Sequence, residues 1–280
     1  MNRSTLIVLH AHPDDESIFT GATIRRAADA GIRVVVVTAT SGEAGPVRVR
    51  LAAGESLRSR RIDELERACD VLGAARLVLL DHRDSGAHAG PYAAGTLGAA
   101  SAARVARQVE RVVRQENACA VVHYDRRGIY GHVDHVQVHR AGRRAARWTG
   151  VSEYRATVDR QRLGAGPLHL VRAAAGDDRT IGVPPHRVGC TLRATVPELL
   201  AKMAAMAAHA SQIGPRWLDP TTFARGYGTE WFVRPGEPGL LDALCGPGPG
   251  TGSAPTAGRR AGRGPGEGAA GVTARPCGVR

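Results

Sequence analysis

The 280-residue sequence predicts an α/β fold, a Rossmann-like three-layer sandwich built on a mostly parallel sheet. Apolar runs of strand length alternate with segments whose apolar residues recur every three or four positions, so strands and helices alternate along the first half of the chain. The run from Val34 to Val37 is β-branched throughout, which is typical of a central parallel strand covered on both faces. Right-handed connections would then bring every loop that follows a strand to one edge of the sheet.

The first half supplies four strands, expected at residues 5–10, 33–38, 76–80 and 119–124. Helices are expected at residues 17–30, 62–72, 97–117 and 134–148. The second helix carries an apolar stripe and ends at Gly73, and the third places four valines on its inner face. These inward residues are Ile62, Leu65, Cys69 and Leu72, and Val105, Val109, Val112 and Val113.

The second half is less regular. Strands are expected at 167–173, 188–196 and 229–233, and a helix at 197–210 with Pro197 in its first turn. Its inward face is expected to hold Leu200, Met203, Met206 and Ala207. From Gly246 the chain is Gly, Pro, Ala and Arg with almost no large apolar residue. We therefore expect one domain over residues 1–245 and a disordered tail over 246–280.

Composition narrows the class of protein. The net charge is +12, but Lys202 is the only lysine and the remaining basic residues are arginines, a bias typical of GC-rich coding sequence. No aromatic pattern of an RNA-binding protein accompanies the charge, so no nucleic-acid partner is expected. Five widely spaced cysteines without a C-x-x-C pair indicate separate thiols rather than a disulfide framework. Neither a signal segment nor a membrane span is recognisable, so a cytoplasmic protein without membrane contact is expected.

Two short stretches concentrate residues that bind metals and transfer protons. His12-Pro13-Asp14-Asp15-Glu16 follows the first predicted strand, and His132-Val133-Asp134-His135 follows the fourth. His12, Asp15 and His135 could hold one zinc ion, since catalytic zinc commonly takes three N or O ligands and leaves a position for water. Asp14 would then be free to act as a general base. A protonated His132 could stabilise an oxyanion, and Asp134 could orient one imidazole.

Other interpretations of these residues remain open. Asp14 or Asp15 could simply cap the helix that follows, and His139, one turn after His135, is a rival metal ligand. Glu16 fits a supporting or helix-capping role better than that of a ligand. The chain lacks a G-x-S-x-G nucleophile elbow and a glycine-rich dinucleotide fingerprint after the first strand, which disfavours those classes of enzyme.

At these residues the chain resembles the LmbE-like, PIG-L family of zinc-dependent de-N-acetylases. The matching motifs are Ala11-His12-Pro13-Asp14-Asp15-Glu16, Arg83-Asp84-Ser85-Gly86, Tyr130-Gly131-His132-Val133-Asp134-His135 and, more loosely, Ala208-His209-Ala210-Ser211-Gln212. The resemblance implies the same metal ligands, with Asp14 as base and His132 as oxyanion partner. It also implies that Arg61 and Asp84 contact the sugar or its aglycone and that Tyr130 approaches the acetyl group. Glu43 is a weaker candidate for substrate binding.

The sequence therefore predicts a zinc-dependent hydrolase, with another divalent metal as an option. It would remove acetyl from an N-acetylglucosamine-type amide of a small glycoconjugate, either a mycothiol-type compound or an antibiotic intermediate. One alternative is an amidase of the same mechanism that cleaves a larger acyl group. A second is a metal-independent sugar-binding or glycosyl-transfer protein. The natural substrate and the oligomeric state are left open.

Overall fold

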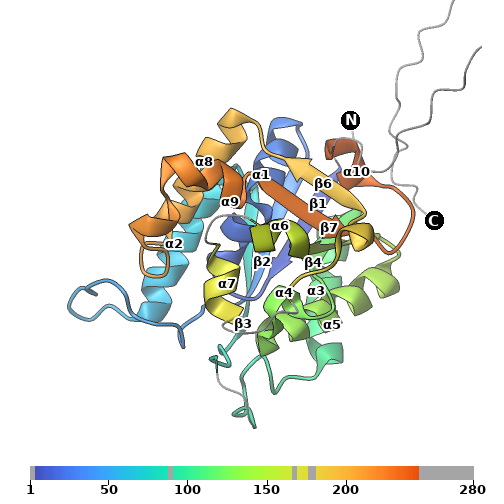
Figure 1. Ribbon diagram of the computed structural model, residues 1–280. Coiled ribbons are helices and arrows are strands. Elements are labelled where there is room, and N and C mark those ends of the chain that lie inside the picture. The colour runs from blue at the N-terminus through green and yellow to red at the C-terminus, as the bar shows by residue number, and fades with distance from the viewer. Residues whose placement is uncertain (1–3, 88–90, 166–168, 176–180, 246–280) are drawn as a thin grey trace, which may run out of the picture.

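The computed structural model describes residues 4–87, 91–165, 169–175 and 181–245. A seven-stranded sheet runs through it in the order β3-β2-β1-β4-β5-β7-β6, and its first five strands along the chain are parallel to their neighbours (Figure 1). Only β7 breaks the pattern, since it pairs antiparallel with both β5 and β6. The predicted mostly parallel α/β sandwich is confirmed.

Strand order reverses between β1 and β4. From β1 the chain proceeds outward to β2 and β3, then returns to the other side of β1 for β4 and β5. Such a reversal leaves a crevice at the carboxyl ends of the two strands, where ligands of open α/β sheets bind. The strands are β1 (Thr5–His10), β2 (Arg33–Thr40), β3 (Arg76–His82), β4 (Ala120–Tyr124), β5 (Ser152–Thr157), β6 (Cys190–Arg193) and β7 (Thr229–Val233).

Helices cover both faces of the sheet. Helices α1, α2 and α8 pack together on one face, and α3 packs against α5 on the other. The valines predicted to face inward from α3 are all buried. The helices are α1 (Asp15–Asp29), α2 (Leu57–Leu72), α3 (Ala102–Gln115), α4 (Gly128–Gly131), α5 (Val133–Thr149), α6 (Arg160–Ala165), α7 (Leu170–Ala175), α8 (Val196–Ala208), α9 (Pro220–Tyr227) and α10 (Leu240–Leu244), with short 3₁₀ turns at Pro185–Arg187 and Pro215–Trp217.

The second half of the chain departs from expectation at two elements. The strand expected at 167–173 is wrong, because Leu170–Ala175 is helical, as its three consecutive alanines favour, and residues 166–168 lie outside the described part. Strand β5 was not predicted. Its buried Tyr154 and Ala156 alternate with less buried residues, a half-buried strand pattern that the polar residues between them obscured.

Helix α8 is rotated relative to the expected face. Leu200 is 56% exposed and Ala207 is also exposed, whereas Lys202 is 1% exposed. The Lys202 ammonium donates to Glu230 Oε1 at 2.6 Å, and the same carboxylate accepts the backbone N–H groups of Ala22 and Thr23. A buried charge is tolerated only when it is paired and hydrogen-bonded, and this network supplies both.

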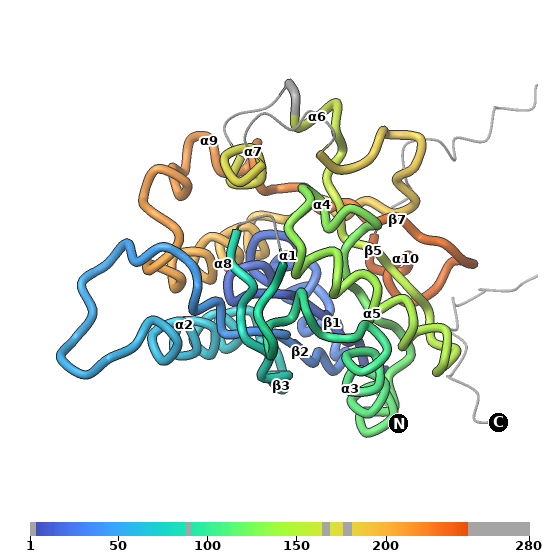
Figure 2. Tube along the Cα trace, turned by 90° about the horizontal axis from the view of Figure 1, so that it is seen from below, coloured from blue at the N-terminus to red at the C-terminus, as the bar shows by residue number. Residues whose placement is uncertain are grey.

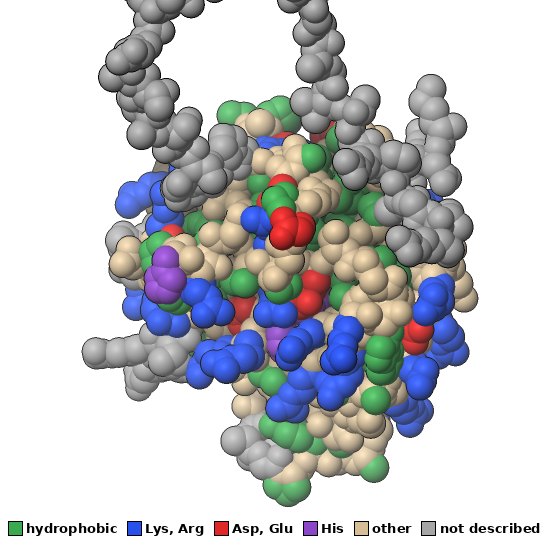
Figure 3. Space-filling model, turned by 90° about the vertical axis from the view of Figure 1, so that its right-hand side faces the viewer, with side chains coloured by type: hydrophobic (Ala, Val, Ile, Leu, Met, Phe, Trp, Pro, Cys, Tyr) green, Lys and Arg blue, Asp and Glu red, His purple; other side chains and the backbone are tan. Residues whose placement is uncertain are grey.

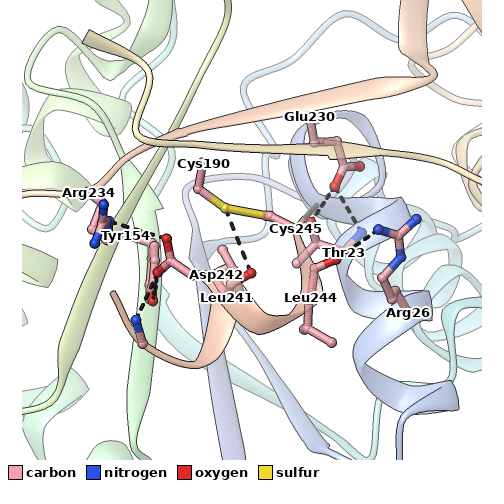
Figure 4. Close-up of a disulfide and its surroundings, with 11 residues drawn as sticks. Thr23, Arg26, Tyr154, Cys190, Glu230, Arg234, Leu241, Asp242, Leu244 and Cys245 are labelled. Carbon is pink, nitrogen blue, oxygen red and sulfur yellow. Dashed lines mark hydrogen bonds and ion pairs between the residues drawn. A yellow bond between two sulfur atoms is a disulfide. The ribbon is translucent and has the colours of Figure 1, made fainter. Parts of the chain in front are cut away.

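A disulfide corrects the expectation of five separate thiols. Cys190 of β6 is bonded to Cys245, just after α10, across 55 residues of sequence (Figure 4). Cys69 and Cys119 form no disulfide, and Cys277 lies outside the described residues with the predicted tail. The two half-cystines are too far apart in sequence for their spacing to reveal the pair, which depends on how β6 lies against α10.

Positive charge gathers on the face formed by α3 and α5 (Figure 3). Each of the two helices carries four arginines, and the acidic residue of α3 is Glu110. These arginines are Arg104, Arg107, Arg111, Arg114, Arg140, Arg143, Arg144 and Arg147. In the described part of the chain, no helix has the length and apolar character needed to cross a membrane.

Candidate active site

The two predicted motifs meet at the crevice between β1 and β4. The first follows β1 directly, and α1 begins at Asp15, two residues earlier than expected. The second forms the start of α5. Figure 2 shows the segments around this edge of the sheet, with the connection after β2 on one side and α7 and α4 on the other. The sheet thus brings together residues more than a hundred positions apart.

Three atoms converge as a metal site requires. His135 Nε2 lies 3.3 Å from both His12 Nδ1 and Asp15 Oδ2, and the latter two are 3.5 Å apart. A tetrahedral ion with bonds of about 2.0–2.2 Å separates its ligand atoms by roughly 3.3–3.6 Å, so the three donors are spaced as zinc would hold them. The donor set of two imidazoles and one carboxylate therefore fits a divalent metal.

The other nitrogen of His12 is held by carboxylates. His12 Nε2 lies 3.3 Å from Asp134 Oδ2 and 3.5 Å from Asp84 Oδ1. Burial alone would lower the pKa of His12, but its hydrogen bonds to the surrounding carboxylates raise that pKa well above its usual value. When a metal displaces the proton on Nδ1, the carboxylates would keep the other proton on Nε2 and direct the Nδ1 lone pair toward the ion beside Asp15 and His135, as in other metal sites.

The imidazole that Asp134 contacts is that of His12. Ser85 holds the same carboxylate, since its backbone N–H donates to Asp134 Oδ2 at 3.0 Å and its hydroxyl donates to Oδ1. His12, Asp84 and Asp134 form a second possible cation cluster, because their donor atoms lie within 4.8 Å of one another. Ser85 was not singled out by the sequence, although it lies inside the Arg83 to Gly86 motif.

Tyr124, at the end of β4, is a second supporting residue that the sequence did not reveal. Its hydroxyl donates to Asp15 Oδ2 at 2.8 Å and accepts the Ala11 backbone N–H at 2.9 Å. Its ring stacks on that of His135 at 4.3 Å with an interplanar angle of 11°. Burial raises the pKa of Asp15, but the facing His135 and His12 lower it well below its usual value. The carboxylate is therefore ionised, as a metal ligand must be.

Asp14 occupies a constrained turn beside the three donors. It stands at the N-cap position of α1 with φ 107°, and its side chain makes no capping hydrogen bond. Arg61 Nη2 donates to Asp14 Oδ2 at 3.2 Å and to the carbonyl of Pro13. Burial raises the pKa of Asp14 to about 6, although Arg61 opposes the shift. A carboxylate with a pKa near neutrality suits transfer of a proton in both directions.

Glu16 and His209 hold the turn at Asp14 through hydrogen bonds. Glu16 Oε2 accepts the backbone N–H of Asp14 at 2.9 Å, and His209 Nε2 lies 2.7 Å from Glu16 Oε1. Both side chains are fully buried. Glu16 therefore supports the turn that carries Asp14, and His209, from the loosely matching motif at 208–212, contacts Glu16 in turn.

His132 lies beside the cluster in a neutral state. Its Nδ1 accepts the backbone N–H of Asp134 at 3.2 Å, which leaves the proton on Nε2. Burial and the neighbouring His12 and His135 lower the pKa of His132 to about 3. An oxyanion would thus meet a neutral N–H donor rather than the imidazolium that the sequence suggested.

The residues implied to bind substrate fall into two groups. Asp84, Tyr130 and Arg61 line the same cavity as His12, Asp14 and Asp15, and the Tyr130 hydroxyl lies 3.4 Å from His135 Nε2. Glu43 does not line it. Its carboxylate accepts the backbone N–H of Asp84 at 3.0 Å and the Ser41 hydroxyl at 2.7 Å, and so joins the loops after β2 and β3.

His139 is directed away from this cluster. Its Nδ1 lies 2.9 Å from the carbonyl oxygen of Tyr124, and its ring lies 5.4 Å from that of His123. Neither candidate cation group of the described residues includes it. The geometry favours His135 over His139 as a ligand.

The cavity has a volume of about 260 Å³. Small-molecule sites usually enclose roughly 300–1,000 Å³, so this cavity is slightly smaller than a typical one. Polar walls come from the cluster of His12, Asp14, Asp15 and His132 and from the loops after β2 and β3, and apolar walls come from α1, α7 and the segment after α8.

Comparison with known proteins is consistent with this geometry. Residues 7–146 match the family model described as PIG-L: GlcNAc-PI de-N-acetylase. The 1D-myo-inositol 2-acetamido-2-deoxy-alpha-D-glucopyranoside deacetylase of Acidothermus cellulolyticus is 36% identical, over 82% of this chain and 88% of the relative. The enzyme of the same name from Salinispora arenicola is 34% identical, over 88% and 87%.

A similar fold occurs in the crystal structure of A40926 pseudoaglycone deacetylase. The TM-score is 0.59 at 20% identity, over 85% of this chain and all of that one. These likenesses favour a hydrolase over the alternative of a metal-independent sugar-binding or glycosyl-transfer protein. The chain therefore belongs to the PIG-L family and is a deacetylase that hydrolyses an amide bond.

Proposed function

We propose that the chain removes acetyl from the 2-acetamido group of a small glucosaminyl conjugate, with zinc held by His12, Asp15 and His135. The observation that carries the proposal is the spacing of three donor atoms, 3.3 to 3.5 Å apart, beside a carboxylate that is not one of them. The substrate of the actinobacterial relatives, a 2-acetamido-2-deoxyglucopyranoside of inositol, belongs to this class.

A bound divalent ion polarises an amide carbonyl and lowers the pKa of water to about 7. The chain's own residues would perform the proton transfers. Asp14 takes a proton from the water that adds to the carbonyl carbon, and delivers it to the amide nitrogen as the C–N bond breaks. The products are acetate and the free amine.

Other residues would position these groups. His132 donates its Nε2 proton as a hydrogen bond to the oxyanion, and Tyr130 contacts the acetyl group. Asp134, held by Ser85, keeps the His12 ring in orientation, while Arg61 fixes the turn that carries Asp14. Asp84 and Arg61 face the sugar from the cavity wall.

The test is acetate release from 2-acetamido-2-deoxyglucopyranosyl inositol by the purified chain, before and after chelation and again after addition of zinc. Release should fall to background on chelation and return with zinc. If metal analysis shows that the chelated protein holds no metal and turnover nevertheless persists, the proposal is contradicted. Restoration by another divalent ion but not by zinc would contradict the identity of the metal.

A further inference from the structure

The side of the cavity away from the polar cluster is apolar. We define the apolar wall as six residues that line this side: Ile18 and Phe19 from α1, Leu170, Val171 and Ala174 from α7, and Ile213 after α8. Three elements that are distant in sequence thus contribute to one surface. It lies in the same cavity as His12, Asp14 and Asp15 and is continuous with the reacting centre.

The apolar wall extends from the metal ligands to the cavity's outer part. Phe19 meets His135 edge to face, with ring centroids 6.3 Å apart. At the other end, α7 packs beside α4, the helix that carries Tyr130. The backbone N–H of Leu170 donates to the Tyr227 hydroxyl at 3.1 Å, and the His169 ring lies against the Tyr227 ring, tilted by 36° with centroids 4.4 Å apart. These contacts anchor α7 where it forms the wall.

Polar partners are scarce in this part of the cavity. Among the described residues that line it, those with polar side chains outside the catalytic cluster are Arg48 and Gln212. The amide nitrogen of Gln212 already donates to the carbonyls of Pro46 and Ser211, each at 2.9 Å. A polyol placed against the apolar wall would lose hydrogen bonds to water without replacement, which disfavours its binding.

We propose that the natural substrate carries an apolar aglycone that packs against the apolar wall, in contrast to the inositol of the curated relatives. This inference rests on the proposed function. A single acetyl methyl covers only a small part of the apolar wall, and the sugar itself is polar. The aglycone is therefore the part of the substrate that meets Leu170, Val171 and Ala174.

The direct test compares the zinc-loaded enzyme on methyl, butyl and octyl 2-acetamido-2-deoxy-α-D-glucopyranosides and on the inositol glycoside. Each methylene that becomes buried should raise kcat/KM by about fourfold, until the wall is covered. The octyl glycoside should then exceed the inositol glycoside. Equal rates along the alkyl series, or preference for inositol, would overturn the inference and leave the deacetylase assignment intact.

Two neighbouring alanines of α7 supply a matched pair of variants. Ala174 lines the cavity, whereas Ala173 does not, and both are exposed enough to accept a larger side chain. Ala174→Glu should lower kcat/KM for the octyl glycoside by about tenfold, because a charge beside the wall removes the burial of one or two methylenes. The methyl glycoside should change little, and Ala173→Glu should alter neither substrate.

Failure of the two proposals is distinguishable. No acetate from any of these glycosides, with zinc demonstrably bound, would overturn the proposed function itself. Faster hydrolysis of N-octanoyl than of N-acetyl methyl glucosaminide would show that the apolar wall receives an acyl chain, and would overturn the aglycone assignment. An equal effect of Ala174→Glu and Ala173→Glu would also overturn it.

Discussion

Arg61 shows how a residue implied to bind substrate can also serve the chain itself. Its guanidinium is buried, donating to the carbonyl of Gly42 at 2.7 Å and to the turn at Pro13 and Asp14. A Cβ on Gly42 would lie 2.4 Å from Arg61 Cζ, and Gly42 has φ 67°, so glycine is required for this close approach. Arg61 therefore links the loop after β2 to the turn that carries Asp14.

Replacement of Asp14 by Asn separates proton transfer from metal binding. The amide keeps the shape of the side chain but cannot accept a proton at neutral pH, so kcat should fall by about a hundredfold or more. Metal content, measured by elemental analysis, should be unchanged because Asp14 is not among the three converging donors. Asp29→Asn, at the exposed end of α1, is the control. Near-normal turnover of the Asp14 variant would remove Asp14 from the role of base.

The rival histidines can be compared in the same way. His135→Ala removes one of three donors and should abolish stoichiometric metal binding, whereas His139→Ala should retain metal because its ring bonds to the Tyr124 carbonyl. Circular dichroism would verify that both variants fold. A full zinc complement in the His135 variant, with loss in the His139 variant, would reverse the assignment.

The residues of the site differ in how well their position there could be predicted from the sequence. His12, Asp15 and His135 stand in dense motifs at strand ends, so topology alone predicts that they meet. Tyr124 and Ser85 support the site through hydrogen bonds from other elements, to Asp15 and to Asp134, and these contacts are visible only in three dimensions. The neutral state of His132 depends on burial and on neighbouring rings, neither of which spacing reveals.

At the scale of elements, the sequence pattern predicts those strands and helices whose formation depends mainly on local interactions. The first four strands and the helix ending at Gly73 follow from apolar periodicity and a left-handed cap, with φ 77° at Gly73. The face of α8 could not be predicted, because Lys202 is drawn inward by Glu230, a residue on a different element.

The disulfide joins two of these less predictable elements. Closing a loop over 55 residues of sequence stabilises a fold by about 4 kcal/mol in the chain-entropy account. A reducing agent should therefore lower the Tm of the wild-type chain, and should not affect a Cys190→Ser/Cys245→Ser double variant, whose Tm should already be low. A wild-type Tm that is indifferent to the reducing agent would show that the bond does not contribute.

On the scale of the whole molecule, charge is distributed unevenly. The exposed charged residues of α2 are of both signs and include Arg58 and Arg67 as well as Asp63 and Glu66, whereas those of α3 and α5 are mostly arginine. None of the arginines on α3 and α5 lines the cavity. These eight arginines therefore place positive charge on one face of the protein (Figure 3), away from the cavity.

The buried position of Lys202 also determines how the protein reacts with amine-directed reagents. It is the only lysine of the sequence, and its ammonium is enclosed with Glu230 at 1% exposure. A succinimidyl ester or an acetyl donor thus finds no lysine side chain on the surface of the folded chain. Modification of Lys202 requires the sheet and α8 to separate. The fraction of modified Lys202, measured by mass spectrometry, would therefore report the fraction of molecules that have unfolded in this region.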